Sequence, residues 1–370
     1  MLTHSLACEI AKRRHHLIGV LPGEGIGPEV VPAALALLHH LQGVDGHHFE
    51  VCHGGVIGHA AESLHGQSLS SEVIDFVQGI FRNGGALFCG PGGGRFVYEL
   101  RRHFDLFCKF TPLQTMPALH DVGLLQSGKL ADVDIIAVRE NTGGIYQGTG
   151  RLWQDDAGQW QASHLFSYSQ NQVDRILQVA IRLARQRRGK LCVVLKPGGI
   201  PEISSLWLHR LHELATDEAL QVQMLEIDNA LFQLVARPEQ FDVIVSPNLF
   251  GDVIADTGGL LLGSRGLCYS GNFNAQGHAV YQTGHGAALD LAGRDVANPF
   301  GQMLSLAMLL EESCHWPAGA QLIRDALQAV AARGVRTRDI ATVGMTPVGT
   351  RAMADAVQQE LLQQLEVRGG

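Results

Sequence analysis

The chain has 370 residues, of which 46% are hydrophobic and 17% charged, so it is long enough for one large or two ordinary domains with buried cores. With 36 acidic against 28 basic residues the net charge is −8, and because no long basic block occurs, nucleic acid is not the expected partner. No apolar run reaches membrane-spanning length, and the N-terminal basic cluster follows a short apolar patch, the wrong order for a secretory signal.

The number and spacing of the cysteines and histidines bear on disulfide bonds, zinc binding and the expected cellular compartment. The seven cysteines are scattered, odd in number and without a C-x-x-C pair, which favours neither a disulfide framework nor a zinc site. We therefore expect a cytoplasmic protein. Many of the 18 histidines occur as adjacent pairs rather than at ligand spacing, so most are predicted to be surface residues.

The first predicted elements are a buried strand at 17–21, a glycine-rich turn at 22–29 and a helix over 30–41. Free backbone N–H groups at the start of such a helix can bind an anion or a nucleotide. The turn contains G-x-G-x-G, which is not the Rossmann fingerprint, so a purely structural turn is equally consistent with the pattern.

The chain then alternates between helical and strand patterns: helix 71–82, strand 84–90, helix 96–102, strand 135–138, helix 169–189, strand 191–195, and a helical remainder from 303 to 366 with one interruption near 346–347. The strand at 191–195 ends in Lys196. Burial there would lower the pKa of the lysine and suit it to proton transfer, whereas a structural lysine with its head in water is the alternative.

The stretch 246–266 carries the strongest chemical signal. A strand at 241–245 is broken by Pro247, and the following helix places Asp252 and Asp256 four residues apart on one face. Two like charges at this spacing repel each other, and a hard divalent cation would compensate them. A solvated acidic face is the alternative, but the neighbouring residues are apolar or glycine, so a surface face is not expected.

This segment, NLFGDVIAD (248–256), resembles the metal-binding signature of the isocitrate/isopropylmalate dehydrogenase family, the metal-dependent β-decarboxylating hydroxyacid dehydrogenases. Matches to that family follow the same order along the chain at PGEGIGPE (22–29), VRENTGGIYQG (138–148), IDNALFQLV (227–235) and HGAALDLAG (285–293). The chain is more similar to the NAD-dependent isopropylmalate, tartrate and D-malate enzymes than to NADP-dependent isocitrate dehydrogenase.

The resemblance implies an α/β fold of two lobes around a large sheet system, and not a Rossmann fold. Residues 1–106 and 263–370 would form the first, cofactor-binding lobe. Residues 107–262 would form an inserted second lobe with the dimer contacts, and the active site would lie between the lobes.

The same resemblance implies a metal site for Mg²⁺ or Mn²⁺ formed by Asp252, Asp256 and Asp228. In the family, Asp228 and the lysine at position 196 enter the site from the second subunit. A homodimer with shared active sites is therefore implied, and Asp228 would also contact the substrate.

Four side chains acquire roles in catalysis and substrate binding by the resemblance. Arg101 and Arg139 would bind substrate carboxylates, for which a guanidinium is well shaped. Lys196 would handle the hydroxyl proton during oxidation, and Tyr146 would protonate the enol product. A tyrosine is a poor proton donor at its ordinary pKa of about 10 and would need a cationic neighbour; a packed turn aromatic is the alternative for Tyr146.

The cofactor residues implied by the resemblance are His285, Gly286, Asp290 and Asn298. A carboxylate at Asp290 can accept hydrogen bonds from ribose hydroxyls and repels the additional phosphate of NADP, so NAD is the expected cofactor. For His285 alone, a structural histidine with satisfied hydrogen bonds is the ordinary interpretation.

The chain departs from the family pattern in three places. Thr111 stands where a second carboxylate-binding arginine is usual, and Arg95 and Lys109 are the candidates for supplying the missing charge. Gly198 replaces an asparagine that contacts the nicotinamide. The family residues that select the substrate side group are also replaced, by Gly94, Val97 and Tyr98.

We therefore predict an enzyme that oxidises and decarboxylates a 3-substituted malate, a small 2-hydroxy di- or tricarboxylic acid, with NAD and Mg²⁺ or Mn²⁺. A regulatory paralogue that binds ligand without turnover is the first alternative. The second is an ordinary Rossmann oxidoreductase that does not decarboxylate, which the absence of G-x-G-x-x-G before a helix disfavours.

Overall fold

A computed structural model describes residues 2–6, 13–123, 125 and 127–369. The helices are α1 (Gly27–His40), α2 (Gly58–His65), α3 (Ser71–Arg82), α4 (Phe96–His103), α5 (Gln170–Gln186), α6 (Pro201–Leu214), α7 (Ile227–Ala236), α8 (Asn248–Leu262), α9 (Phe300–Glu312), α10 (Pro317–Ala332) and α11 (Thr350–Gly369). The strands are β1 (His15–Leu21), β2 (His48–His53), β3 (Ala86–Cys89), β4 (Cys108–Gln114), β5 (Asp134–Glu140), β6 (Thr149–Gln154), β7 (Trp160–Leu165), β8 (Lys190–Leu195), β9 (Gln221–Glu226), β10 (Val243–Ser246), β11 (Tyr269–Phe273) and β12 (Ala279–Thr283).

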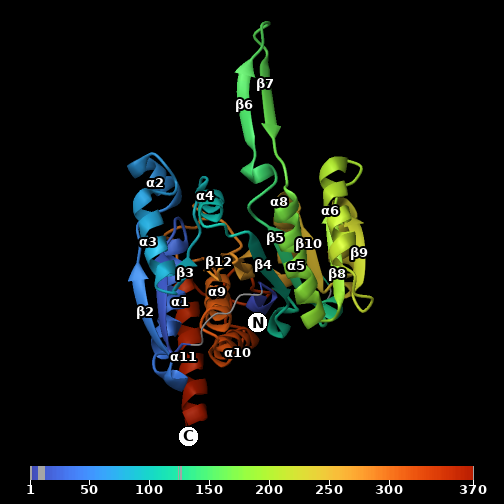
Figure 1. Ribbon diagram of the computed structural model, residues 1–370. Helices are drawn as coiled ribbons and strands as arrows, with labels where there is room; N and C mark the ends of the chain where they lie inside the picture. Colours follow the sequence, from blue (N-terminus) through green and yellow to red (C-terminus); the bar gives the residue numbers. More distant parts are fainter. Residues whose placement is uncertain (1, 7–12, 124, 126, 370) are drawn as a thin grey trace.

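Ten strands form one continuous sheet in the order β2-β1-β3-β12-β11-β4-β5-β10-β8-β9 (Figure 1). Adjacent strands are parallel from β2 to β12 and from β5 to β9. In the middle of the sheet, β12, β11, β4 and β5 pair antiparallel. The predicted α/β fold without Rossmann topology is therefore confirmed.

The two-lobe division stays a proposal, and the strand order is consistent with it. The five strands from residues 1–106 and 263–370 are contiguous in the sheet, and so are the five from residues 107–262. The proposed boundary thus falls between β11 and β4.

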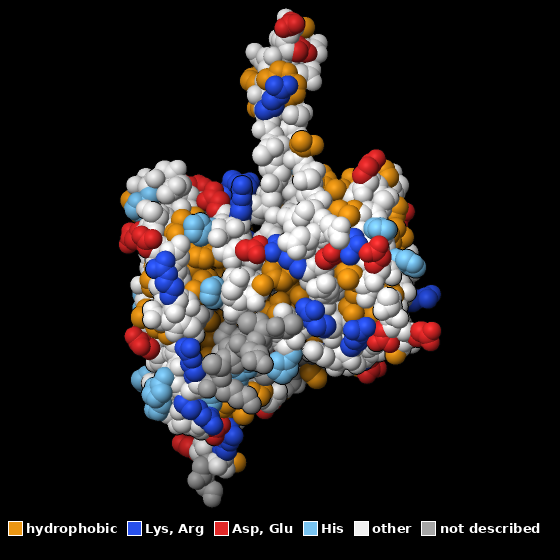
Figure 2. Space-filling view, in the orientation of Figure 1, with side chains coloured by type: hydrophobic (Ala, Val, Ile, Leu, Met, Phe, Trp, Pro, Cys, Tyr) orange, Lys and Arg blue, Asp and Glu red, His pale blue; other side chains and the backbone are white. Residues whose placement is uncertain are grey.

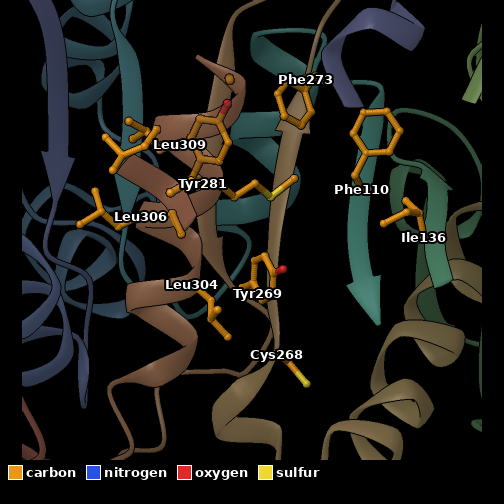
Figure 3. Packing of buried hydrophobic residues seen from close by; sticks show 14 of the residues in the cluster. Phe110, Ile136, Cys268, Tyr269, Phe273, Tyr281, Leu304, Leu306 and Leu309 are labelled. Atoms are coloured by element: carbon orange, nitrogen blue, oxygen red, sulfur yellow. The ribbon is translucent and has the colours of Figure 1, made fainter. Parts of the chain in front are cut away.

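The central strands consist of nearly continuous apolar residues because helices cover both faces of the sheet. All residues of β3 and β10 are buried, as expected for parallel strands between two helical layers. On one face a single large core joins the strands to α1, α5, α9 and α10. Figure 3 shows part of it, where Phe110, Phe273 and Tyr281 pack ring against ring beside leucines of α9.

The opposite face of the sheet carries two separate cores. One lies under α3 and α4, and the other lies under α7 and α8. Between them, β4 and β5 present the polar residues Lys109, Thr111 and Arg139, which are buried nonetheless. This gap between the two cores is where the candidate site lies.

Most predicted elements agree with the structure in place and type, but the C-terminal region differs. It contains three helices rather than a helical stretch with one interruption. The first break was missed because it is only four residues long: His315 adopts a positive φ of 50° and Pro317 begins α10.

A two-stranded arm, β6 and β7, was not predicted. It projects away from the rest of the chain (Figure 1), and almost all of its residues are exposed on both faces. A period-two signal depends on one buried face, and the arm has none within a single chain.

No helix within the described residues combines the length and the apolar character needed to cross a bilayer. The six cysteines in that part of the chain are free thiols, and Cys8 lies outside it. The absence of disulfide bonds among the described cysteines agrees with the sequence analysis.

Not all of the paired histidines are at the surface. His16 and His47 are buried and stack on one another, with 2.8 Å between His16 Nε2 and His47 Nδ1. Burial, together with the nearby His47, His15, His315 and Arg13, lowers the pKa of His16 from 6.5 to about 4, and burial also lowers the pKa of His47.

This histidine pair should make the fold acid-labile. The unfolded chain binds a proton at His16 near pH 6.5, whereas the folded chain does so only near pH 4, so stability falls as the pH drops through this window. Between pH 7 and pH 5, His16 alone would contribute a loss of about 2 kcal/mol. Urea unfolding at pH 7 and pH 5 should show this difference, and His16→Phe should reduce it while His65→Gln, an exposed control, leaves it unchanged. An equal pH dependence in wild type and His16→Phe would contradict the assignment.

Candidate active site

The candidate site lies on the polar gap of the sheet, between α4 and α8. Arg139 extends from β5, Tyr146 from the turn after it, and Asp252 from the first turns of α8. Gly251 allows this close approach of helix and strand, because a Cβ there would lie 2.7 Å from the Cβ and Cγ of Arg139.

Arg139 is held by a fixed set of acceptors. Its Nε and Nη2 donate to Asn248 Oδ1 at 3.0 and 2.8 Å, and its Nη1 donates to Asp252 Oδ1. Asn248 is itself fixed, since its Nδ2 donates to the Gly143 carbonyl at 2.8 Å. The sequence analysis did not single out Asn248, although it opens the NLFGD segment.

Asp252 also accepts a 2.9 Å hydrogen bond from the Tyr146 hydroxyl. Burial opposes ionisation of Asp252, but Arg139, Lys109 and the Tyr146 hydrogen bond outweigh it and hold the pKa of the carboxyl below its usual value. Burial and Asp252 in turn raise the pKa of Tyr146 to about 12, although Arg139 lies 5.5 Å from its ring. The cationic neighbour that the sequence analysis required is present, yet the phenol remains firmly protonated.

Asp256 lies one turn further along α8, with its side chain 53% exposed and 3.1 Å from Arg265 Nη2. Its apolar neighbours Val253 and Leu260 are also exposed. The prediction that this helix does not present a surface face is therefore wrong for the isolated chain.

Lys196 and Asp228 form a second, separate cluster. Lys196 Nζ donates to Glu226 at 2.6 Å and to Asp228 at 2.9 Å. These hydrogen bonds raise the pKa of Lys196, so the expectation that burial lowers it is wrong for the single chain, where the side chain is 32% exposed. Glu226 was missed by the sequence analysis, although it directly precedes the matched 227–235 segment.

Neither cluster alone completes a metal site. Within the part of the chain that the structure describes, no three His, Cys, Asp or Glu side chains converge on one point. Asp252 and Asp256 offer hard oxygen donors on one helix face, which is the chemistry that Mg²⁺ or Mn²⁺ requires. Asp252 and Asp256 therefore fit two ligand positions of a Mg²⁺ or Mn²⁺ site, and a third protein ligand would have to come from elsewhere.

A cavity of about 840 Å³ lies beside this region and contains most of the predicted cofactor residues. His285, Gly286 and Asn298 line it, together with Arg294 and Arg338. His285 Nε2 is buried without a hydrogen-bond partner among the described residues, so a ligand could satisfy it. Asp290 is exposed and does not line the cavity; its carbonyl accepts a hydrogen bond from Arg294.

The glycine-rich turn after β1 forms one wall of this cavity. Ile26 lines it and donates its backbone N–H to the Ala287 carbonyl at 2.9 Å. Gly25 is required there, because its φ is 59° and a Cβ would lie 1.9 Å from the same carbonyl oxygen. Glu24 holds the turn by accepting hydrogen bonds from the backbone of Ala60 and Gly93.

The chain belongs to the isocitrate/isopropylmalate dehydrogenase family, whose sequence model matches residues 17–357. Family membership places it among the dehydrogenases, which are oxidoreductases.

The relatives of the chain agree with this assignment over almost its full length. It is 37% identical over 366 residues to 3-isopropylmalate dehydrogenase of Synechococcus sp. (strain JA-3-3Ab), covering 95% of this chain and 94% of the relative. It is 35% identical over 353 residues to 3-isopropylmalate dehydrogenase of Hydrogenovibrio crunogenus, covering 91% and 97%. Among solved structures it resembles isocitrate dehydrogenase from Methylococcus capsulatus with a TM-score of 0.83 and 29% identity, covering 94% and 99%.

Proposed function

We propose that this chain catalyses the NAD-dependent oxidative decarboxylation of a 3-substituted malate in the cytoplasm, using Mg²⁺ or Mn²⁺ at sites shared between two copies. The observation that carries the proposal is the Arg139–Asp252–Tyr146 cluster, which joins a carboxylate-binding cation, a metal-type donor and a proton donor. The names of the relatives support a hydroxy-acid substrate.

In this proposal the chain binds and orients the substrate and moves two protons. Arg101 and Arg139 hold substrate carboxylates, and Tyr146 delivers a proton from its hydroxyl to the carbon left by CO₂. Lys196, in its neutral amine form, accepts the proton of the substrate hydroxyl. Because the hydrogen bonds to Glu226 and Asp228 raise its pKa, it must first leave these partners and lose its own proton. When bound, the nicotinamide would accept the hydride and the cation would stabilise negative charge on the substrate oxygen.

Two features support a homodimer. The arm exposes Leu152, Trp160 and Leu165 to between 67 and 76%, and Figure 2 shows hydrophobic side chains on its surface. An isolated two-stranded hairpin with such a surface is at best marginally stable, so a second chain would cover it. Phe232 of α7 is exposed to 69%, and Val253 and Leu260 of α8, the helix that packs against α7, are also exposed.

A second copy would also complete the metal site. Asp228 and Lys196 lie in a cluster apart from Asp252 and Asp256 within one chain. If Asp228 and Lys196 face the Asp252 cluster of a second copy, each site receives its third carboxylate and its lysine.

The cavity lined by His285, Gly286 and Asn298 would hold the dinucleotide, with Arg294 and Arg338 suited to its phosphates. Preference for NAD over NADP depends on Asp290, whose carboxylate would repel a ribose phosphate. Initial rates with NAD and NADP under the same conditions would measure this preference.

The proposed function should depend on metal. Wild type should form NADH and release CO₂ from at least one of isopropylmalate, D-malate, tartrate and homoisocitrate with Mn²⁺. Treatment with EDTA should reduce NADH formation to background, and Mn²⁺ should restore it, since two hard carboxylates without a cation cannot chelate the substrate. Full activity in EDTA would refute the metal-dependent mechanism.

A ligand-binding paralogue without turnover remains the second candidate, because Thr111 and Gly198 depart from the family pattern. Within the described residues, no heavy atom beyond the chain neighbours of Gly198 lies within 4 Å of a Cβ built at that position, so this position is open. The same panel decides: binding of an acid without NADH formation would favour this candidate.

A further inference from the structure

Three cations converge on one side of Asp252. Lys109 of β4 and Arg139 of β5 are paired across the two strands, so both side chains emerge on the same face of the sheet. Arg101 approaches from the last turn of α4. All three residues are buried, with 5% of Lys109, 5% of Arg101 and 2% of Arg139 exposed.

These three cations differ in their hydrogen-bond and ion-pair partners. Arg139 donates to Asn248 and Asp252. By contrast, within the described residues the Lys109 ammonium and the Arg101 guanidinium form no hydrogen bond or ion pair. Burial, followed by the repulsion of neighbouring arginines, lowers the pKa of Lys109 to about 7 and that of Arg101 to about 9.

The nearby carboxylates, Asp252 and Asp256, are already engaged with other side chains, so neither serves as a structural partner of Lys109. Asp252 uses one oxygen for Arg139 and the other for Tyr146, and Asp256 is paired with Arg265. A buried ammonium without a counterion is costly, and a fold gains nothing from it unless an anion arrives from outside. The side chain of Asp252 is 34% exposed, so the cluster is open to solvent at that end.

We infer that Lys109 is a substrate ligand whose ammonium, with Arg101 and Arg139, binds a carboxylate of the hydroxy acid. This inference rests on the proposed function and assigns a specific residue to it. Thr111 lies two residues further along β4 on the same face, opposite Ala137, and brings no charge. Lys109 thus supplies the positive charge that Thr111 lacks, from a position two residues earlier on the same face of the strand.

The test uses Lys109→Met, Lys109→Arg and the exposed control Lys129→Met, with D-malate plus Mn²⁺ as the titrated probe. Calorimetry should show binding weakened about 10- to 100-fold in Lys109→Met, the range expected for one charged hydrogen bond. Lys109→Arg should recover at least part of the affinity. KM should rise in Lys109→Met with kcat within about threefold, because a ground-state contact is removed.

A stability measurement separates this role from a structural one. Without ligand, Lys109→Met should unfold at the same temperature as wild type or a higher one, because an unpaired buried charge is replaced by an apolar side chain of similar length. NAD binding should be unchanged in all three variants. A structural lysine would instead give a lower unfolding temperature and weaken NAD and D-malate binding together.

Wild-type affinity for D-malate in Lys109→Met would overturn the inference. Its failure is distinguishable from failure of the proposed function. Weakened D-malate binding in Lys109→Met, combined with a wild type that produces no NADH from any acid of the panel, would uphold Lys109 as an anion ligand and refute the enzyme.

Discussion

An equal mixture of two inactive variants, Lys196→Met and Asp252→Asn, should recover about a quarter of wild-type activity if the sites are shared across a two-fold dimer. Each variant alone should be inactive, because both of its sites lack either the lysine or the metal ligand. In a mixed dimer one site combines the intact Lys196 of one chain with the intact Asp252 of the other. The second site carries both defects.

The measurement is NADH formation after the two variants are unfolded together and refolded, which allows chains to exchange. Variants refolded separately and then combined briefly on ice provide the control. If Lys196 and Asp252 served the same site within one chain, every site would keep one defect, and no recovery would occur. That result would exclude a shared site.

Replacing Tyr146 by phenylalanine should have the next largest effect, lowering kcat by about 10²- to 10⁴-fold with little change in KM. The variant loses only the hydroxyl, which donates to Asp252 at 2.9 Å, and retains the ring that packs 5.1 Å from the ring of Tyr98. Substrate binding by the arginines is untouched. The protonation step loses its donor.

Stopped-flow and steady-state kinetics with the best acid of the panel would measure the effect in Tyr146→Phe. Binding of D-malate with Mn²⁺ should remain within about threefold of wild type, which shows that the cluster is intact. An increase in KM at unchanged kcat would mean that Tyr146 only packs against Tyr98 and the substrate.

The sequence predicted the elements of the site better than its contacts. The strand before Arg139 and the helix carrying Asp252 were found because apolar periodicity is a local signal, whereas the segment with Tyr146 was recognised by its resemblance to a family motif. That Arg139 lies opposite Lys109 depends on β4 and β5 pairing antiparallel in one particular register, which no local pattern specifies.

Long-range partners explain the remaining errors. The pKa of Lys196 was predicted to fall because its strand is apolar, but Glu226 and Asp228, brought in by β9 and α7, reverse the direction. The adjacent histidines were predicted to lie mostly at the surface, but pairing of β1 with β2 stacks His16 on His47, and Trp316 covers the His47 ring at 4.5 Å. Each error concerns a polar side chain whose environment comes from a distant segment.

The order of strands in the sheet also constrains how the chain can fold as it is synthesised. The strands β4, β5, β8, β9 and β10 all lie between residues 108 and 246, so they can pair with one another before the last third of the chain exists. β1, β2 and β3 are made first, yet β3 has no neighbour on its inner side until β12 is complete at residue 283. Until then the inner edge of β3 stays open, whereas the five strands of the other half of the sheet can already pair with one another.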